Sequence, residues 1–524
     1  MPAPHPALSP EKRLLFEKLL AKKGMAAPAG GGITPRRGND PVELTSLQEG
    51  MWFIEQLNPG TATYNVPMAA RLNGELNLPA LHRALDEIVQ RHESLRTTFP
   101  EMGGVPRQVI LPPQSIPFPL LDVAGDEAQA LRLATAEARA PFNLATELPI
   151  RAQLIRLTLT HHLLLITIHH IVTDGWSMGV LTRELIARYR HYTASTEPAP
   201  IAALPIQFGD YARWQRNWLK GETLANLLGF WRESLGGHSF ALNLPLDHPR
   251  PPLQSGRGLH HTFTLPPELS DTLRQISQHQ GVTLFAVLLA VFKALLSAWG
   301  GQDDIIVGTP IANRNRTELE GMIGYFVNLL PLRTKIGEQD RLGELARRVY
   351  QTTLEANAHQ ELPFGKLVEE LQPARDASRN PIFQVEFTLL DPAHAPPVYG
   401  YGFRLPARQA IEFAGLTLTP LDIESEASKF DLTVLLWDMP GGISGTFEFN
   451  ADLFETGTII SAAGHFEALL QQAAASPDIT VAALKQVYAG RQREDTARQR
   501  QAKRDTGAKR IQTIRRKSVA DKEN

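Results

Sequence analysis

Histidines are the residues of this chain best suited to proton transfer, and they occur in three adjacent pairs. The pairs at 161–162 and 260–261 begin strand-like runs and need no special role. The third pair ends the apolar run LLLITI and comes shortly before Asp174 and Gly175 in the string HHIVTDGWS. A near-neutral imidazole accepts a proton from an attacking amine or hydroxyl, or orients that nucleophile. This string is therefore the strongest catalytic candidate.

A strand that ends in polar residues before a glycine turn places those side chains at the mouth of an α/β sheet. His170 and Asp174 are then expected to face each other across a tight loop. For a single HxxxD match, a structural histidine satisfied by a carboxylate is the competing interpretation. Joint metal binding by His169 and His170 is disfavoured, because adjacent residues at a strand end point to opposite faces. No metal site is expected.

Composition and length limit the kinds of protein that this chain can be. A chain of 524 residues predicts two lobes of roughly 200 residues each. The net charge of −2 provides no overall field to attract nucleic acid or an anionic membrane. The longest apolar run, 284–299, is interrupted by Lys293 and is shorter than the ~20 residues that cross a bilayer, so it predicts a buried helix. The absence of cysteine and of an apolar secretory segment is compatible with the cytoplasm, where we expect the protein.

Hydrophobic periodicity predicts an α/β lobe over residues 42–218 and a second over 219–485. An amphipathic helix is predicted over 1–24, followed by a linker at 25–41 rich in Ala, Gly and Pro. In the first lobe the predicted strands and helices are 66–72, 79–92, 127–138, 150–157, 163–169 and a helix after Gly175. In the second lobe they are 261–265, 267–279, 284–299, 305–309, 327–333, 383–389, 432–437, 445–449 and 456–474.

Residues 486–524 form a basic tail that differs from the rest of the chain. Between 491 and 524 there are twelve Lys or Arg and five Asp or Glu, with few large apolar residues. Such a segment cannot bury a face, so it is predicted to be a solvated helix or disordered. A solubilising extension is the favoured interpretation, and docking to another protein is the alternative.

The string HHIVTDGWS resembles the HHxxxDG signature of nonribosomal peptide synthetase condensation domains, and companion motifs follow in family order. These are SLQEGMWF (46–53), RHESLRTTF (91–99), GDYARWQR (209–216), IGYFVNLLPLR (323–333), HQELPFGKLV (359–368), RDASRNPIFQV (375–385), KFDLTV (429–434) and FEFNADLF (447–454). The resemblance covers about residues 42–474. One motif alone is weak evidence, whereas the ordered set is highly specific.

The resemblance implies two chloramphenicol-acetyltransferase-like α/β lobes that form a V-shaped pseudo-dimer with a central tunnel. It implies an acyltransferase that joins a donor acyl or peptidyl thioester to the amine of an acceptor aminoacyl thioester, forming an amide. Both groups arrive on the phosphopantetheine of donor and acceptor peptidyl carrier proteins, and the chain itself binds no cofactor. The basic tail would then meet adjacent synthetase modules if it docks at all. Neither nucleic acid nor a membrane is expected as a partner.

The resemblance also implies roles for individual residues. His170 is the catalytic base or positioning group, with His169 beside it, and Gly175 lets the backbone approach the thioester. Asp174 is structural and pairs with Arg96 of the RHExLR motif, because an unpaired buried carboxylate is costly. Further candidates line the tunnel, although packing or lobe bridging explains them equally well: Trp176, Ser177, Tyr325, Asn328, Arg375 and Asn380.

Other activities of the same superfamily remain open. A free-standing enzyme that forms an ester and a non-catalytic recruitment domain are the alternatives. Epimerisation is disfavoured because IGYFVN resembles the condensation version of its motif, and heterocyclisation because that subtype replaces HHxxxDG. The string HHIVTDGWSMGVL is most similar to the subtype that joins two L-configured residues. Departures from the family pattern leave the subtype open: Leu47, Gly50, Arg213, Leu329 and Gly365.

Overall fold

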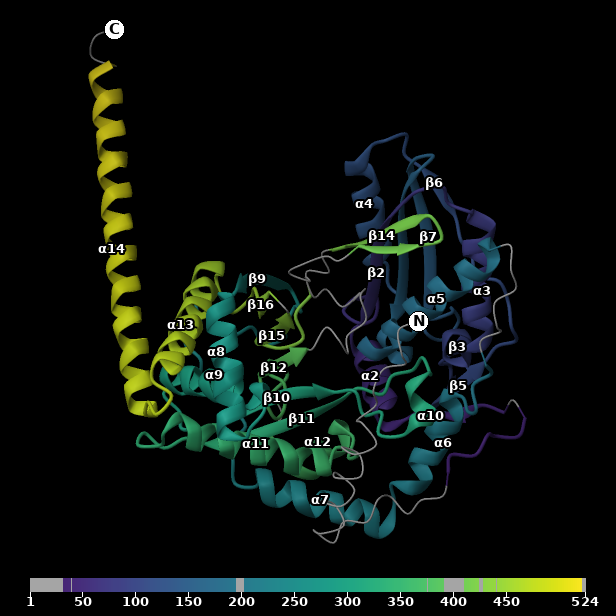
Figure 1. The fold of residues 1–524 in the computed structure, drawn as a ribbon, viewed down its shortest axis with the longest axis horizontal. Coiled ribbons are helices and arrows are strands. Elements are labelled where there is room, and N and C mark those ends of the chain that lie inside the picture. The colour runs from purple at the N-terminus through teal and green to yellow at the C-terminus, as the bar shows by residue number, and fades with distance from the viewer. Residues whose placement is uncertain are drawn as a thin grey trace.

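The computed structural model describes residues 32–520, apart from 39, 195–201, 375, 391–409, 424–426 and 440. Two α/β lobes lie beside each other and are joined at one end, which gives the molecule the outline of a V (Figure 1). The predicted fold class is confirmed. The helix predicted over 1–24 lies outside the described residues, as do residues 25–31 and 39 of the predicted linker.

The first lobe is built on a six-stranded sheet of order β13-β14-β2-β8-β7-β6. Its centre is β8 (His161–His169), which is buried along almost its whole length. Helices α3 (Leu78–Arg91) and α5 (Gly175–Thr193) cover one face of the sheet, and α4 (Glu127–Ala138) covers the other. Because both faces are covered, the sequence of β8 is a nearly continuous apolar run.

The remaining elements of this lobe are three more strands of that sheet, β2, β6 and β7, and the segments around it. They are β1 (Val42–Glu43), α2 (Ser46–Leu57), β2 (Asn65–Asn73), η1 (Glu93–Arg96), β3 (Thr97–Thr98), β4 (Glu101–Met102), β5 (Val105–Ile110), β6 (Leu120–Asp122), β7 (Ile150–Thr158), η2 (His170–Val172) and α6 (Phe208–Trp218).

The second lobe has its own six-stranded sheet, of order β11-β10-β12-β15-β16-β9. Helix α9 (Leu284–Gly300) is the predicted buried helix, and it packs between the sheet and α8 (Pro267–Gln280), α11 (Leu342–Ala358) and α13 (Thr456–Ala475). Its one charged residue, Lys293, interrupts the apolar run. The Lys293 side chain donates to the Leu332 carbonyl at 2.6 Å, so this polar group has a hydrogen-bond partner inside the core. This helical layer lies on the side of the sheet that faces away from the first lobe (Figure 1).

The other elements of the second lobe are α7 (Gly221–Leu235), β9 (Gly258–Thr264), β10 (Asp304–Ile311), α10 (Thr317–Glu320), β11 (Asn328–Lys335), α12 (Phe364–Leu371), β12 (Val385–Leu390), β15 (Leu432–Met439) and β16 (Gly442–Asn450). Every strand and helix predicted from the sequence of 42–474 has a counterpart of the same type. Among the described residues no single helix is long and apolar enough to cross a membrane, and the α8 and α9 pair that reaches the length is bent by 106°.

One segment departs from the predicted lobe boundaries. Strands β13 (Ile411–Phe413) and β14 (Leu416–Leu421) lie in the range assigned to the second lobe, yet β14 pairs antiparallel with β2 in the sheet of the first lobe. The boundaries at 42–218 and 219–485 therefore need this correction. The physical reason is that alternation in a sequence identifies a strand but not the sheet edge that it joins.

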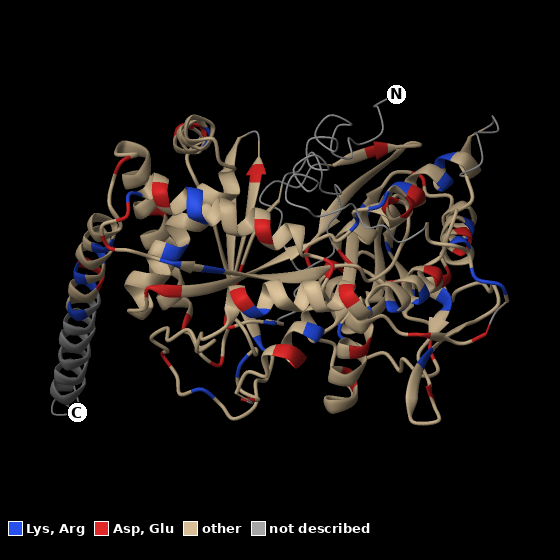
Figure 2. Cartoon of the chain, turned by 90° about the horizontal axis from the view of Figure 1, so that it is seen from below, with Lys and Arg blue, Asp and Glu red and all other residues tan. Residues whose placement is uncertain are grey.

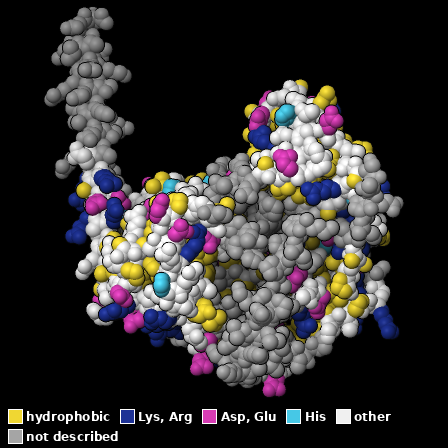
Figure 3. All heavy atoms as spheres, viewed as in Figure 1, with side chains coloured by type: hydrophobic (Ala, Val, Ile, Leu, Met, Phe, Trp, Pro, Cys, Tyr) yellow, Lys and Arg dark blue, Asp and Glu magenta, His cyan; other side chains and the backbone are white. Residues whose placement is uncertain are grey.

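The basic tail is helical as far as it is described, in α14 (Val481–Ala520). Its first turns pack on α13, where His465 Nε2 lies 3.0 Å from Asp495 Oδ2 and its ring meets the ring of Tyr488 edge to face. The helix then runs away from the lobe (Figures 1 and 2). The docking role of the basic tail stays a prediction. On the face shown in Figure 3, charges of both signs are dispersed over the two lobes.

Candidate active site

The loop that follows β8 fixes the orientation of the His170 ring. The backbone N–H of His170 donates to the Tyr64 carbonyl at 2.8 Å, and its Nδ1 lies 2.7 Å from the Thr173 carbonyl. A carbonyl oxygen only accepts, so Nδ1 carries the proton of the neutral ring. The unprotonated nitrogen is then Nε2, which is the atom that a general base requires.

The surroundings of His170 favour the neutral ring. Burial holds the pKa of His170 well below its usual value, and the positive charge of Lys429 lowers it further, against the hydrogen bond to Thr173. The ring of Tyr325 meets the imidazole edge to face, with centroids 5.0 Å apart, and Tyr64 lies 6.4 Å away. Burial raises the pKa of Tyr64 to about 12 and also raises that of Tyr325, so both phenols are neutral. The imidazole is thus available as a base at neutral pH.

His169 takes different partners from its neighbour. Its Nδ1 accepts from the Ile171 N–H at 3.1 Å, and its Nε2 lies 3.3 Å from Glu55 Oε1. Its ring also meets the ring of Phe142 edge to face. These contacts make His169 a support of the loop that precedes α5. Within the described part of the chain, no group of three or more His, Cys, Asp or Glu is arranged to hold a metal ion.

Helix α2, which carries the SLQEGMWF motif, supports the histidine loop from behind. Thr45 and Gln48 form a capping box at its start, with Gln48 N–H donating to Thr45 Oγ1 at 3.2 Å. The side chain of Gln48 then donates to the Ile171 carbonyl at 3.0 Å. This contact satisfies a buried backbone group one residue after His170, so the motif contributes to the position of the ring.

The expected pairing of Asp174 with Arg96 is wrong. Asp174 caps α5, accepting from Ser177 N–H at 2.8 Å, and its other carboxylate oxygen accepts from Phe326 N–H at 3.0 Å. The cation beside it is Arg314 of the second lobe, whose Nη2 lies 3.2 Å from Asp174 Oδ1. Both side chains of this pair are almost fully buried.

Arg96 has nearer partners, which explains the error. Its guanidinium lies 3.6 Å from Glu93, three residues earlier, and donates to the Leu111 carbonyl. Arg314 instead stands in the polar stretch that follows β10, with its guanidinium over the ring of Phe326 at 4.1 Å. A buried carboxylate requires a cation, but that requirement does not say which arginine supplies it.

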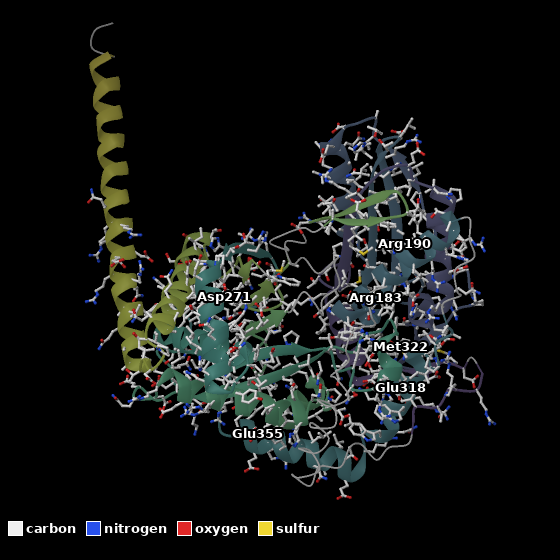
Figure 4. All side chains as sticks on the ribbon, in the orientation of Figure 1. Arg183, Arg190, Asp271, Glu318, Met322 and Glu355 are labelled. Atoms are coloured by element: carbon white, nitrogen blue, oxygen red, sulfur yellow. The ribbon has the colours of Figure 1, made fainter. Side chains whose placement is uncertain are left out.

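Arg314 also holds the loop between β10 and β11 under helix α5. It donates to the Met322 carbonyl at 2.7 Å and to Ser177 Oγ at 2.8 Å. Figure 4 labels Glu318 and Met322 in this connection and Arg183 on α5. The loop is closely packed, since a Cβ atom on Gly324 would come within 2.1 Å of the Phe208 ring. The second lobe therefore completes the support of the histidine loop.

The remaining predicted site residues divide into three groups. Trp176 and Ser177 bridge the lobes, because Trp176 Nε1 donates to the Glu320 carbonyl and Ser177 Oγ donates to the Gly324 carbonyl, each at 2.8 Å. Tyr325 contacts His170, and Gly175 opens α5. The third group consists of residues whose described contacts do not reach His170.

In that third group, the Asn328 amide donates to the carbonyls of Gln360 and Leu362 and accepts from Phe364 N–H, so it fixes the start of α12. The backbone carbonyl of Asn380 accepts from Gln384 at 2.8 Å. Arg375 lies outside the described residues. The residues that sequence reasoning missed are Arg314, Tyr64, Gln48 and Lys429, of which the last two lie inside the motifs quoted above.

Comparison with known proteins identifies the family. The Condensation domain family model matches residues 39–494. One of the linear gramicidin synthase proteins of Brevibacillus parabrevis is 41% identical over 461 residues, which are 87% of this chain and 6% of that protein. Phosphinothricin tripeptide synthetase PhsC of Streptomyces viridochromogenes is 40% identical over 485 residues, which are 91% of this chain and 43% of that protein. The chain thus spans less than half the length of these relatives.

Solved structures agree with this result. The X-domain in its complex with OxyB from teicoplanin biosynthesis has a TM-score of 0.78 and is 28% identical, covering 88% of this chain and 99% of its own. The chain therefore belongs to the condensation domain family of nonribosomal peptide synthetases, with the two-lobed fold of that family.

We predict that a double-mutant cycle separates the two arginines. Asp174→Asn combined with Arg314→Gln should show a coupling of at least about 1 kcal/mol in the free energy of unfolding, because the pair is buried and in contact. Asp174→Asn combined with Arg96→Gln should be additive within about 0.5 kcal/mol. Urea unfolding of the single and double variants measures both couplings, and equal couplings would contradict the assignment.

Proposed function

We propose that the chain forms an amide bond between a donor acyl or peptidyl thioester and the amine of an acceptor aminoacyl thioester. The observation that carries this proposal is the neutral, buried imidazole of His170, oriented by the Thr173 carbonyl. The acceptor nitrogen attacks the thioester carbonyl carbon, and Nε2 of His170 takes a proton from that nitrogen or orients it. The carbon–sulfur bond then breaks, and the leaving thiolate receives the proton.

The protonation state of the imidazole matters for both versions of this role. A protonated ring has no lone pair with which to accept a proton from an amine or hold it in place. The lowered pKa of His170 removes this obstacle at neutral pH. A single base of this kind is worth about 10²–10⁴ in rate.

We propose peptidyl carrier proteins, which present both groups on phosphopantetheine, as the partners. The support is family membership together with an exposed apolar patch on α2, formed by Phe53, Ile54 and Leu57. Phe53 is 58% exposed and Leu57 is 62% exposed, and clustered apolar exposure of this kind is typical of interaction sites. The buried side of the same helix holds Gln48 against the histidine loop. A carrier bound at this patch would stand next to the catalytic element.

A non-catalytic recruitment role is the second candidate, because the X-domain of comparable fold has been crystallised in a complex with OxyB. The oriented His170 and the satisfied Asp174 favour catalysis over this alternative. Ester formation by attack of a hydroxyl would use the same imidazole, so the identity of the product distinguishes it from amide formation.

Replacement of His170 by alanine should lower the rate of amide formation about 10²–10⁴-fold, because the base or positioning group is lost. The variant should melt within a few degrees of the parent, since the Asp174–Arg314 pair and the Gln48 contact that hold the loop stay in place. The measurement is single-turnover transfer between loaded carriers, with the exposed His161→Ala variant as the matched control. A parental rate for the His170→Ala variant would favour the recruitment role.

Leu57→Glu on the α2 patch should reduce transfer from carriers at least about tenfold by raising KM, because a carboxylate there opposes apolar docking. Transfer between small thioesters that mimic the end of phosphopantetheine should keep the parental rate. Leu159→Glu is the control, since Leu159 is 82% exposed on the turn between β7 and β8. The assignment of the patch fails if both substitutions have the same effect on KM for carriers.

A further inference from the structure

A lysine of the second lobe reaches the site built by the first. Nζ of Lys429 lies 5.7 Å from the centroid of the Tyr64 ring, and that ring lies 6.4 Å from the ring of His170. The positive charge of Lys429 is, after burial, the largest influence that lowers the pKa of His170. Neither the transfer mechanism nor the Asp174 pair uses this residue, so its position requires its own explanation.

The turn that carries Lys429 is held rigidly ahead of β15. The Ser428 N–H donates to the Gly256 carbonyl at 2.8 Å, and Ser428 Oγ donates to the Phe430 carbonyl at 2.6 Å. On the other side, Asp431 forms an ion pair with Arg250, whose Nη1 lies 2.9 Å from Asp431 Oδ1. The base of the lysine side chain is therefore fixed, which limits the positions that its ammonium group can take.

Two carboxyl groups stand behind the lysine on the same sheet. Glu386 on β12 is opposite Thr433 on β15, and Thr433 is opposite Glu448 on β16, so the three residues form one row across three strands. The alternate residues of these strands, such as Phe387 and Phe447, pack into the helical layer, so the row lies on the face turned toward the first lobe (Figure 1).

The charges of this cluster depend on one another. Burial raises the pKa of Glu386 and of Glu448 to about 7 each, while Lys429 opposes that rise. Burial lowers the pKa of Lys429, and Glu448 and Glu386 counteract this effect. The carboxyl groups thus oppose the loss of the proton that burial of Lys429 favours.

We propose that Lys429 is a positioning residue for the condensation reaction, and that the second lobe holds its charge beside Tyr64 so that the catalytic imidazole stays unprotonated. This inference rests on the proposed role of His170. Among the described residues, the titratable groups around the imidazole and the ammonium are neutral or cationic on one side, His169, Tyr64 and Tyr325, and carboxyl groups on the other, Glu55, Asp174, Glu386 and Glu448. Both tyrosines are neutral, and the ammonium group is the charge with the largest influence on the pKa of His170.

The sign of the expected effect follows from the charge. A cation disfavours protonation of a nearby imidazole, so removing it raises the pKa of His170. The acid limb of kcat/KM, which reports the base of the free enzyme, then moves to higher pH. A lysine that served only to pack the lobes would lower the rate at every pH and leave the limb in place.

The test compares Lys429→Met and Lys429→Gln with Lys429→Arg, which keeps the charge, and with Lys220→Met in the connection between α6 and α7 as the control. Lys429→Met and Lys429→Gln should move the acid limb of kcat/KM up by about one pH unit. Lys429→Arg and Lys220→Met should keep the acid limb of the parent. Two uncharged variants are used so that one misfolded protein does not decide the outcome. An unchanged limb in a folded uncharged variant overturns the proposal.

A second readout does not require activity. Proteins labelled with ¹³C at the histidine Cε1 position give one NMR signal per ring, and the His170 signal is assigned by its loss in His170→Ala. Its titration should move up by the same amount in Lys429→Met and Lys429→Gln. If the parental chain forms no product while this titration moves, the proposed function fails, and only the effect of Lys429 on the pKa of His170 stands. A titration that does not move overturns the role of Lys429 whatever the activity.

Discussion

The buried ion pair of Asp174 and Arg314 is the constraint on which the site depends. An unpaired carboxylate in that place would cost several kcal/mol, so the structure must bring a cation and further donors to it. The cation comes from the second lobe, and the donors are Ser177 N–H in α5 and Phe326 N–H in the loop after β10. This pair therefore joins the two lobes at the residue where helix α5 begins, four residues after His170.

The orientation of the imidazole follows from this support. The loop between β8 and α5 is held by Asp174 at one end and by Gln48 behind it, which leaves the Thr173 carbonyl to set the tautomer of His170. Tyr64 and Tyr325 surround the ring without adding charge, and Lys429 adds one from the second lobe. Both lobes thus contribute to the surroundings that favour a neutral imidazole, although His170 itself lies in the first lobe.

Local pattern was sufficient to predict most of the elements and the catalytic loop. The run LLLITI gave β8 because a strand covered on both faces is apolar throughout, and α4 was predicted over its observed span of 127–138. Contacts between residues far apart in the sequence were not predictable in this way. By charge alone, either Arg96 or Arg314 could neutralise Asp174. Only the fold shows that Arg96 pairs with Glu93 and that Arg314 pairs with Asp174. The pairing of β14 with β2 depends on which sheet edge is open, which alternation does not record.

The most direct test of the account is mass spectrometry of the products formed when the chain is mixed with donor and acceptor carriers loaded with defined L-aminoacyl thioesters. The account predicts that the donor group moves to the acceptor carrier and is linked to the acceptor amine. Hydroxylamine, which cleaves esters and thioesters but not amides, should then release the donor and acceptor groups from the carrier still joined to each other. Transfer no faster than that between the carriers alone, or a product linked through a hydroxyl, would contradict amide formation through His170.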